Sequence, residues 1–312
     1  PPRPEACITT TPEAIYHAQK SKYCPVPLLG FIRELKNRKG PVAVVGISCQ
    51  IHGLRNILDT IPKLQSKVAF TVGLVCDRIL TFAALDYLVD KADLNHGNPT
   101  VVHFRDKTVS GYPGDVHVFS ENGKSRVMPA KTRMQIKDYF TPARCRLCFD
   151  KMNVFSDITV GDPHGLQGVD RKHGESMLVV RNEEGREIVK YASQSGAINI
   201  RPVKYEQVLR GQGIYKKKEQ WRGYIEAWKQ MGNTLPDYYE QVTNHAPIPG
   251  DLHNYRRDLR YSLALDGFSS RQELIRQVEQ MLKKKQLYSR LFYPFRLPWR
   301  AVRKTFRLVS GG

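Results

Sequence analysis

Four cysteines are the residues of this sequence whose types and spacing could bind a metal. Cys145 and Cys148 form a Cys-x-x-Cys pair on what we expect to be an irregular loop, and that spacing turns two sulfurs to the same side. Cys49 and Cys76 stand alone, each at the end of an apolar run. Together they make the four thiolates that a [4Fe–4S] cluster needs. A zinc site, or buried structural thiols with one chance pair, are the alternatives.

The single cysteines follow two similar patterns of strand, turn and helix. Residues 42–45 and 68–75 are continuous apolar runs, typical of strands buried on both faces of a parallel sheet. The carboxyl ends of neighbouring parallel strands meet at one edge of a sheet, where open α/β sheets bind their ligands. We therefore expect Cys49 and Cys76 to lie at the same edge.

The remaining patterns predict a mixed chain of α/β (α+β) class, with parallel-type βα units first and a β-rich portion after them. Helices are expected over residues 12–20, 26–38, 51–61, 79–91, 130–139, 184–193, 216–231 and 269–287, and strands over 101–106, 115–119, 126–128, 156–160, 176–181 and 197–202. One domain is expected over residues 1–202, with the βα units at 8–98 and the β-rich portion at 99–202. A basic helical extension then covers 203–312.

The composition favours a water-soluble globular protein in a reducing compartment. Hydrophobic residues make up 41% of the sequence and charged residues 25%, which is ordinary for such proteins. No apolar run approaches the roughly 20 residues of a transmembrane helix. Six cysteines in 312 residues are too few for a disulfide-framed secreted domain.

The strongly positive charge points to an acidic or polyanionic partner. The formal net charge is +19, and it does not by itself choose between nucleic acid, an acidic protein, a lipid surface and an anionic cofactor. From Lys283 onward, nine lysines and arginines are mixed with aromatic residues and no acidic residue occurs. This segment is a membrane-surface anchor, a docking arm for an acidic protein, or a solvated tail.

With these residues laid out, the chain resembles the beta-subunit family of coenzyme F420 hydrogenases and dehydrogenases, which includes 7-hydroxymethyl chlorophyll a reductases and divinyl reductases. The resemblance covers roughly residues 8–200 and keeps the order of six short motifs. These are Ser21-Lys22-Tyr23, Gly46-Ile47-Ser48-Cys49-Gln50, Gly73-Leu74-Val75-Cys76, Phe104-Arg105-Asp106-Lys107, Cys145-Arg146-Leu147-Cys148 and Asp157-Ile158-Thr159-Val160-Gly161-Asp162. In two respects the sequence departs from the family. Ile47-Ser48 stands where the family usually has Thr-Pro, and a further cysteine-rich segment found in many members is not present.

The resemblance implies that the protein binds FAD and a [4Fe–4S] cluster, with the four cysteines as cluster ligands. The residues that the resemblance suggests for flavin binding are Ser21, Lys22, Tyr23, Ser48, Gln50, Asp77 and Gly161. A turn at a helix N-terminus offers free N–H groups to a pyrophosphate, and a lysine adds a full positive charge. The alternative is that Lys22 is a surface charge and Tyr23 packs in the core. The lack of a G-x-G-x-x-G motif argues against a Rossmann dinucleotide site.

Asp162 and His164 are the catalytic candidates, in the turn over residues 161–165. His164 could donate a proton to a substrate beside a reduced flavin, and Asp162 could orient a group on the cluster or flavin side. The alternatives are that Asp162 caps the turn and that His164 is structural.

We therefore expect a flavin- and [4Fe–4S]-dependent oxidoreductase that passes electrons from ferredoxin or reduced F420 to an organic small-molecule acceptor. It would work in the cytoplasm or a plastid stroma, with membrane-surface contact through the basic C-terminus and no nucleic-acid partner. One alternative is a non-catalytic electron-transfer subunit of a larger complex. A zinc-stapled nucleic-acid-binding protein is the other.

Overall fold

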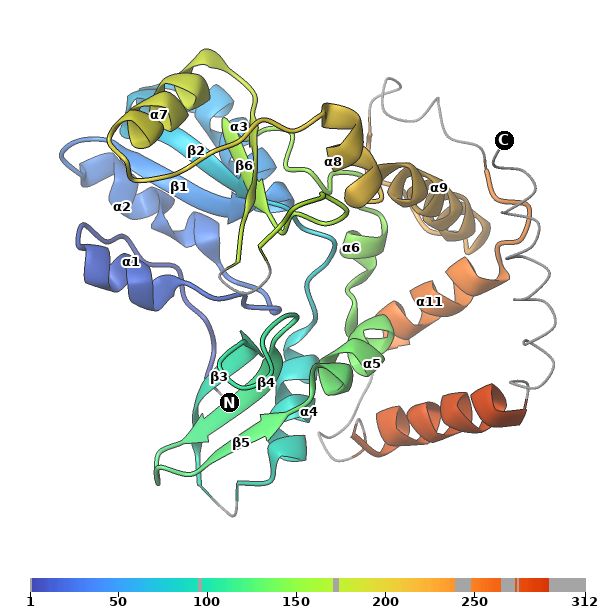
Figure 1. Ribbon diagram of the computed structural model, residues 1–312. Coiled ribbons are helices and arrows are strands. Elements are labelled where there is room, and N and C mark those ends of the chain that lie inside the picture. The colour runs from blue at the N-terminus through green and yellow to red at the C-terminus, as the bar shows by residue number, and fades with distance from the viewer. Residues whose placement is uncertain are drawn as a thin grey trace.

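Two sheets with helices around them make up the part of the chain that the computed structural model describes (Figure 1). The described residues are 2–94, 97–170, 174–238, 248–264, 273 and 275–291. The first sheet has the order β1-β2-β6-β7 and the second has the order β3-β4-β5. This arrangement confirms the mixed α/β fold class that the sequence predicted.

The four-stranded sheet is parallel except for its last strand. Its strands are β1 (Val42–Ile47), β2 (Val68–Leu74), β6 (Ile158–Gly161) and β7 (Met177–Val180). β1 pairs with β2 and β2 with β6 in parallel, whereas β7 runs antiparallel to β6. Because parallel neighbours require a crossover, α3 (Ser48–Thr60) and η2 (Pro62–Lys67) connect β1 to β2. The carboxyl ends of β1, β2 and β6 therefore meet at one edge.

One face of this sheet is covered by α3. Ile51, Leu54 and Leu58 recur at helical spacing and are buried, and they pack with Val44 of β1. The same cluster includes Leu35 of α2 (Ile32–Asn37). The packing fixes the first turn of α3, which carries Cys49, against the end of β1.

The second sheet is antiparallel and packs on two helices. It contains β3 (Pro99–Asp106), β4 (Asp115–Ser120) and β5 (Ser125–Met128), with α4 (Phe82–Ala92) and α5 (Ala130–Phe140) against it. Leu88, Phe104, Val116 and Phe140 belong to its buried core. β4 and β5 pair as an antiparallel hairpin, and Gly123 in the turn between them adopts a positive φ of 76°.

Near the N-terminus the structure shortens a predicted helix. α1 (Pro12–Ala18) agrees with the prediction, and the Thr11 hydroxyl accepts a hydrogen bond of 3.3 Å from the Ala14 N–H at its start. The helix expected over residues 26–38 is divided into a 3₁₀ turn, η1 (Leu28–Phe31), and α2. Its first two residues, Val26 and Pro27, are not helical, since a proline disfavours the helical conformation of the residue before it, and Pro27 itself has a ψ of 60°.

The prediction of a strand over residues 197–202 is wrong, because the first backbone N–H groups of this segment bond to the C-terminal end of a helix. α7 (Glu183–Gln194) ends just before it, and the N–H groups of Ala197 and Ile198 both donate to the Ala192 carbonyl, at 2.9 and 3.2 Å. The segment pairs with no strand in the described part of the chain, and Ile200 is exposed. Alternating polarity without a partner strand does not make a sheet.

The C-terminal part is helical, as predicted, but contains one helix that the sequence pattern did not indicate. α8 (Tyr205–Gly211) and α9 (Ile214–Gln230) are followed by α11 (His253–Ala264). α11 was missed because it is rich in arginine and has few apolar positions. Residues 275–291 are helical, whereas 269–272, 274 and the aromatic run over 292–312 lie outside the described residues. Within the described residues, no helix is long and apolar enough to cross a membrane.

Candidate functional site

The four cysteines expected to bind a metal lie together at the carboxyl edge of the parallel sheet. Cys49 lies in the first turn of α3 and Cys76 follows β2. Cys145 lies in the short helix α6 (Ala143–Arg146), and Cys148 comes just after it. The other three thiols all act on the ionisation of Cys76, so the four are electrostatic neighbours. The prediction of an irregular loop is wrong for Cys145, because Pro142 starts a helical turn there.

Burial keeps three of these thiols protonated while no metal is bound. Burial, together with the neighbouring thiols, raises the pKa of Cys76 to about 12. It raises the pKa of Cys148 to about 11 and also raises that of Cys145. Lys217 of α9 acts in the opposite direction on both members of the Cys-x-x-Cys pair. A metal that displaces these protons would leave thiolates beside the ammonium group of Lys217.

The donor set suits an iron–sulfur cluster. No group of three or more His, Cys, Asp or Glu residues within the described part of the chain is close enough to hold a single metal ion. The four thiols come from three separate segments and are electrostatic neighbours around Cys76, and in a [4Fe–4S] cluster four cysteine thiolates supply all the protein ligands. The residues present therefore fit this cofactor.

Asn153 ties the three cysteine-bearing segments to one another, and the sequence analysis missed it. Its side-chain amide donates to the carbonyl of Gly46 at 2.9 Å, at the end of β1, and to that of Leu74 at 3.4 Å, at the end of β2. It is fully buried and has a φ of 52°, a conformation that asparagine adopts more readily than most residues. A Cβ at Gly73 would collide with it. The only signal in the sequence was an asparagine in a tight turn.

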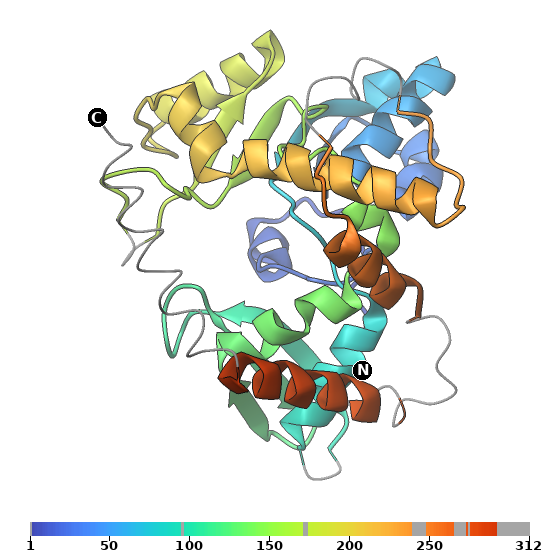
Figure 2. The same ribbon diagram turned by 90° about the vertical axis from the view of Figure 1, so that its right-hand side faces the viewer.

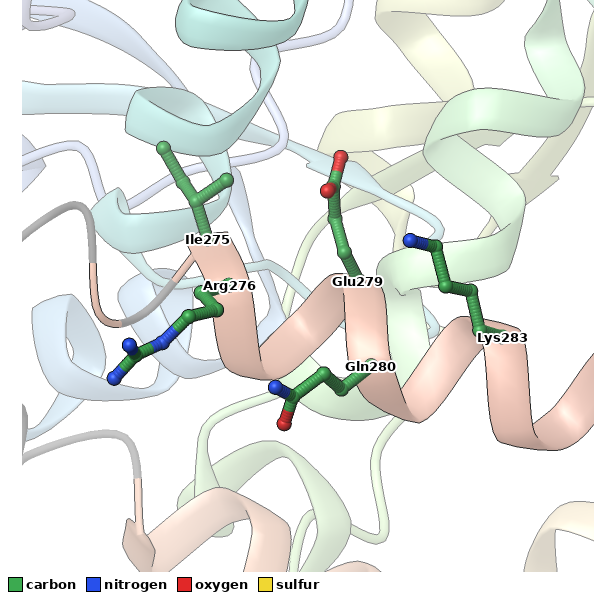
Figure 3. Close-up of a pocket in the computed structure, with 5 residues that line it drawn as sticks. All are labelled: Ile275, Arg276, Glu279, Gln280 and Lys283. Carbon is green, nitrogen blue, oxygen red and sulfur yellow. The ribbon is translucent and has the colours of Figure 1, made fainter.

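One hollow reaches the cysteines, whereas two others lie along the helix over residues 275–291. A cavity of about 220 Å³ opens beside Cys145 and is lined by charged residues that include Arg78, Lys137 and Lys217. The larger of the two on the helix, of about 330 Å³, is shown in Figure 3. Its lining residues are Ile275, Arg276, Glu279, Gln280 and Lys283. All five belong to one helical stretch, with no converging group from a second element, so we assign no site to it.

Arg105 brings together three of the motifs on which the family resemblance rests. Its Nη1 atom lies 3.0 Å from Asp162 Oδ2, and its side chain also bonds to Tyr23. Arg105 belongs to β3 of the antiparallel sheet, whereas Asp162 follows β6 of the parallel sheet. Burial would lower the pKa of Arg105, but Tyr23 and Asp162 outweigh it and raise that pKa. The guanidinium therefore stays charged on a face that both sheets share.

Asp162 and His164 lie next to each other on this face. His164 Nε2 is 3.8 Å from Asp162 Oδ2, and its Nδ1 is 3.4 Å from the Tyr112 hydroxyl. The His164 side chain is 47% exposed, so an incoming molecule can reach it. The turn depends on Gly161, since a Cβ there would lie 2.5 Å from Val75 Cγ2.

Three other residues suggested for flavin binding lie at the carboxyl edge of the parallel sheet: Ser48 and Gln50 in the first turn of α3, and Asp77 after Cys76. Ser48 is buried, and among the described residues its hydroxyl has no hydrogen-bond partner, whereas Gln50 bonds to Ile47 N at 3.0 Å and Val26 O at 2.9 Å. Asp77 lies on the cysteine side. Burial opposes its ionisation, but Arg78 and then Lys217 outweigh burial and lower its pKa.

The Ser21-Lys22-Tyr23 segment lies near the face that carries Arg105. Ser21 is exposed, and Tyr23 packs edge-on against Phe104 with 5.9 Å between ring centroids. Lys22 turns its ammonium back to the end of α1, where it donates to the carbonyls of Ala18 and Gln19. Burial is the main reason why the pKa of Lys22 is lowered. Tyr23 therefore packs against the core and also contacts the Arg105 face.

Residues 40–206 match the family model that describes the C terminus of the coenzyme F420 hydrogenase/dehydrogenase beta subunit. The chain belongs to this family. The resemblance inferred from the six motifs is thereby confirmed, and the chain is a member of a family of F420-linked oxidoreductase subunits.

Individual relatives agree with this assignment at low sequence identity. The beta subunit of the coenzyme F420 hydrogenase of Methanosarcina barkeri is 27% identical over 225 residues, which cover 69% of each chain. The F subunit of the F(420)H(2) dehydrogenase of Methanosarcina mazei is 28% identical, over 58% of this chain and 47% of that protein. The chain thus matches about half of the length of the second relative.

A solved structure shares the fold. A chain of the F420-reducing [NiFe] hydrogenase complex from Methanosarcina barkeri superposes with a TM-score of 0.54 at 22% identity, covering 76% of this chain and 79% of that chain. At this identity the likeness concerns the arrangement of helices and strands. The match to the family model ends at residue 206, before α9 and α11.

Proposed function

We propose that this protein is a flavin- and [4Fe–4S]-dependent oxidoreductase that passes electrons from ferredoxin or reduced F420 to an organic acceptor. The observation that carries the proposal is the meeting of four thiols from three segments at one sheet edge. Membership of a family of F420-linked oxidoreductase subunits supports it. When bound, a flavin exchanges electron pairs and an iron–sulfur cluster exchanges single electrons.

For the cluster, some residues of this chain would supply ligands and others would hold the ligand-bearing segments in place. Cys49, Cys76, Cys145 and Cys148 supply the thiolates, and Asn153 keeps their segments in register. Lys217 offsets part of the negative charge that four thiolates bring into a partly buried place. Exclusion of water by the surrounding packing strengthens that interaction.

For the flavin, two kinds of group favour an anionic cofactor. Arg105, which pairs with Asp162, supplies a positive charge, and the Ser48 hydroxyl at the start of α3, which has no hydrogen-bond partner among the described residues, is a donor still to be satisfied. His164 is held between Asp162 and Tyr112 and is exposed, so it can give a proton to an acceptor bound on this face. We assign these roles to Arg105, Ser48 and His164.

A second candidate function is that of an electron-transfer subunit without a substrate pocket of its own. The relatives in M. barkeri and M. mazei are both named as subunits, and the solved relative belongs to a hydrogenase complex. In that case the organic acceptor would bind a partner protein, and this chain would pass electrons to it.

The purified chain, reconstituted anaerobically with iron, sulfide and FAD, separates these functions. Reduced F420 or reduced ferredoxin is added and the flavin absorbance is followed, with candidate acceptors present or absent. Bleaching of the flavin followed by acceptor-dependent recovery and product supports the enzyme. Bleaching without product supports the subunit. Protein that retains neither flavin nor iron contradicts both.

A further inference from the structure

We propose that the C-terminal helices α9 and α11 are part of the metal centre, because they hold the two residues that separate Cys145 from Cys148. Figure 2 shows α9 and α11 close to the short helix α6, which carries Cys145. This inference rests on the proposed cluster. Both helices lie beyond the residues that match the family model, so that match assigns them no role.

The backbone between the two cysteines is held through the carbonyl oxygen of Leu147. Trp221 Nε1 of α9 donates to it at 2.8 Å, and the Tyr238 hydroxyl donates at 2.7 Å. The two rings lie edge to face, 5.2 Å apart. The Leu147 side chain is buried in the same cluster with Trp221 and Ile225. Both lone pairs of one carbonyl are thus used, and the peptide plane cannot turn without breaking a buried hydrogen bond.

Arg146, the residue before Leu147, is held by side chains of both α9 and α11. The Arg146 side chain is 2% exposed, and its Nε donates to Ser262 Oγ of α11 at 2.6 Å. Its Nη1 lies 3.0 Å from the Tyr224 hydroxyl of α9 and 3.4 Å from Asp258 Oδ2 of α11, and its Nη2 donates to the Asp138 carbonyl. A buried guanidinium with partners at all three nitrogens has little freedom to move.

The consequence is that the directions of the two sulfurs are set before a metal binds. Groups that hold a metal ligand in place through hydrogen bonds change metal affinity by about 10- to 100-fold when they are removed. Trp221 and Tyr238 are therefore positioning residues, since they act on the cluster through Leu147. The extension gives the Cys-x-x-Cys pair a rigid support from outside the sheet that carries Cys49 and Cys76.

The test uses substitutions that remove donors and keep the rings. Tyr238→Phe removes one donor and keeps its ring. Trp221→Phe removes the other and keeps an aromatic ring, although a smaller one. The matched control is Trp228→Phe, on the same helix, which packs against the same cluster and loses a comparable hydrogen bond of 2.9 Å, donated to the Thr234 carbonyl and not to Leu147. Iron loss to a chelator and the electron paramagnetic resonance spectrum of the reduced, reconstituted full chain are compared.

The double variant Trp221→Phe/Tyr238→Phe should lose iron about tenfold faster than the control and show a changed resonance spectrum. Each single variant should have a smaller effect, because one donor still satisfies the carbonyl. Thermal unfolding of the same samples shows that the variants are folded. A double variant that matches Trp228→Phe in both measurements would overturn the inference.

Hydrogen exchange of the metal-free protein distinguishes failure of this inference from failure of the proposed function. If the unchanged chain takes up no iron, the proposed cluster is wrong. Amide hydrogen exchange at residues 143–149 then still tests whether Trp221 and Tyr238 restrain the Cys-x-x-Cys segment. These amides should exchange faster in the double variant than in Trp228→Phe. Equal exchange in the metal-free proteins would show that Trp221 and Tyr238 do not hold this segment.

Discussion

Arg105 and Asp162 form an ion pair of 3.0 Å between the antiparallel and the parallel sheet. Arg105 is 13% exposed and Asp162 34%, so the pair is partly shielded from solvent. The same guanidinium bonds to Tyr23 and lies over the ring of Tyr112, at 5.7 Å. The position of one sheet relative to the other is thus linked to the face on which His164 is exposed.

We expect a double-mutant cycle with Arg105→Gln and Asp162→Asn to give a coupling free energy of about 1 kcal/mol. Because the pair is partly shielded from solvent, its coupling should lie at the upper end of the range for surface pairs. Solvent still screens part of the attraction, which keeps the coupling below that of a buried pair. Urea unfolding of the two single variants and the double variant measures the coupling. Strictly additive effects would mean that this pair does not join the sheets energetically.

Replacement of His164 by glutamine should slow reduction of an organic acceptor by about 100-fold or more and leave flavin reduction by F420 unchanged. The reason is that the side chain would supply a proton only to the acceptor. Stopped-flow absorbance follows the two half-reactions separately. His52→Gln is the control, because His52 stacks on Phe155, 4.5 Å away, in a different part of the protein. An equal loss in both half-reactions would assign His164 to flavin binding instead.

Lys217→Met should make the reduction potential of the reconstituted cluster more negative. The lysine acts on Cys145 and Cys148 and its side chain is 13% exposed, so its charge is only partly screened. Removal of a unit charge at such a site changes the electron affinity by on the order of 1 kcal/mol. Lys218→Met removes the same charge from the next residue, which is exposed, and should have a smaller effect in a redox titration. Equal shifts would assign the effect to net charge alone.

Asp157 should stabilise the fold in a pH-dependent way. Its carboxylate accepts hydrogen bonds from Thr71 N at 2.7 Å, Thr71 Oγ1 at 2.8 Å and Arg55 at 2.7 Å, and it is 6% exposed. Burial opposes ionisation, but the bonds from Thr71 and the other donors outweigh it, so its pKa is lowered in the folded protein. This stabilisation is complete above the unfolded pKa of about 4 and is lost as the pH falls through the folded value.

Asp157→Asn should therefore lower the free energy of unfolding by about 2–4 kcal/mol at pH 7. It should also reduce the loss of stability on acidification below about pH 4. Denaturant unfolding over a pH series measures both effects. Asp59→Asn, at an exposed position of α3, is the control. If Asp157→Asn and Asp59→Asn show the same pH dependence, Asp157 does not carry this effect.

The sequence predicted the meeting of Cys49 and Cys76 because two apolar strands with following helices impose that geometry. It could not predict which groups hold the cysteine segments together. Asn153 bonds to backbone carbonyls more than 75 residues earlier in the chain, and the partner of Arg146 at Ser262 is 116 residues later. Such contacts depend on tertiary packing and leave no periodic pattern.

The role of Arg105 also depended on the three-dimensional structure. Its motif was visible in the sequence, but its partners Tyr23 and Asp162 lie in segments that only the fold brings together. The helix over residues 253–264 was missed for a similar reason. Its buried side includes polar contacts, such as Ser262 with Arg146, that a hydrophobic pattern does not report.

The central claim is that Cys49, Cys76, Cys145 and Cys148 together bind one iron–sulfur cluster. Iron and sulfide analysis of the anaerobically reconstituted chain, with electron paramagnetic resonance after reduction, tests it most directly. We expect about four iron and four sulfide per chain. Alanine at Cys76 or Cys148 should abolish the signal, whereas alanine at the exposed Cys7 should leave it unchanged. A colourless protein with one zinc per chain and no iron would contradict the claim.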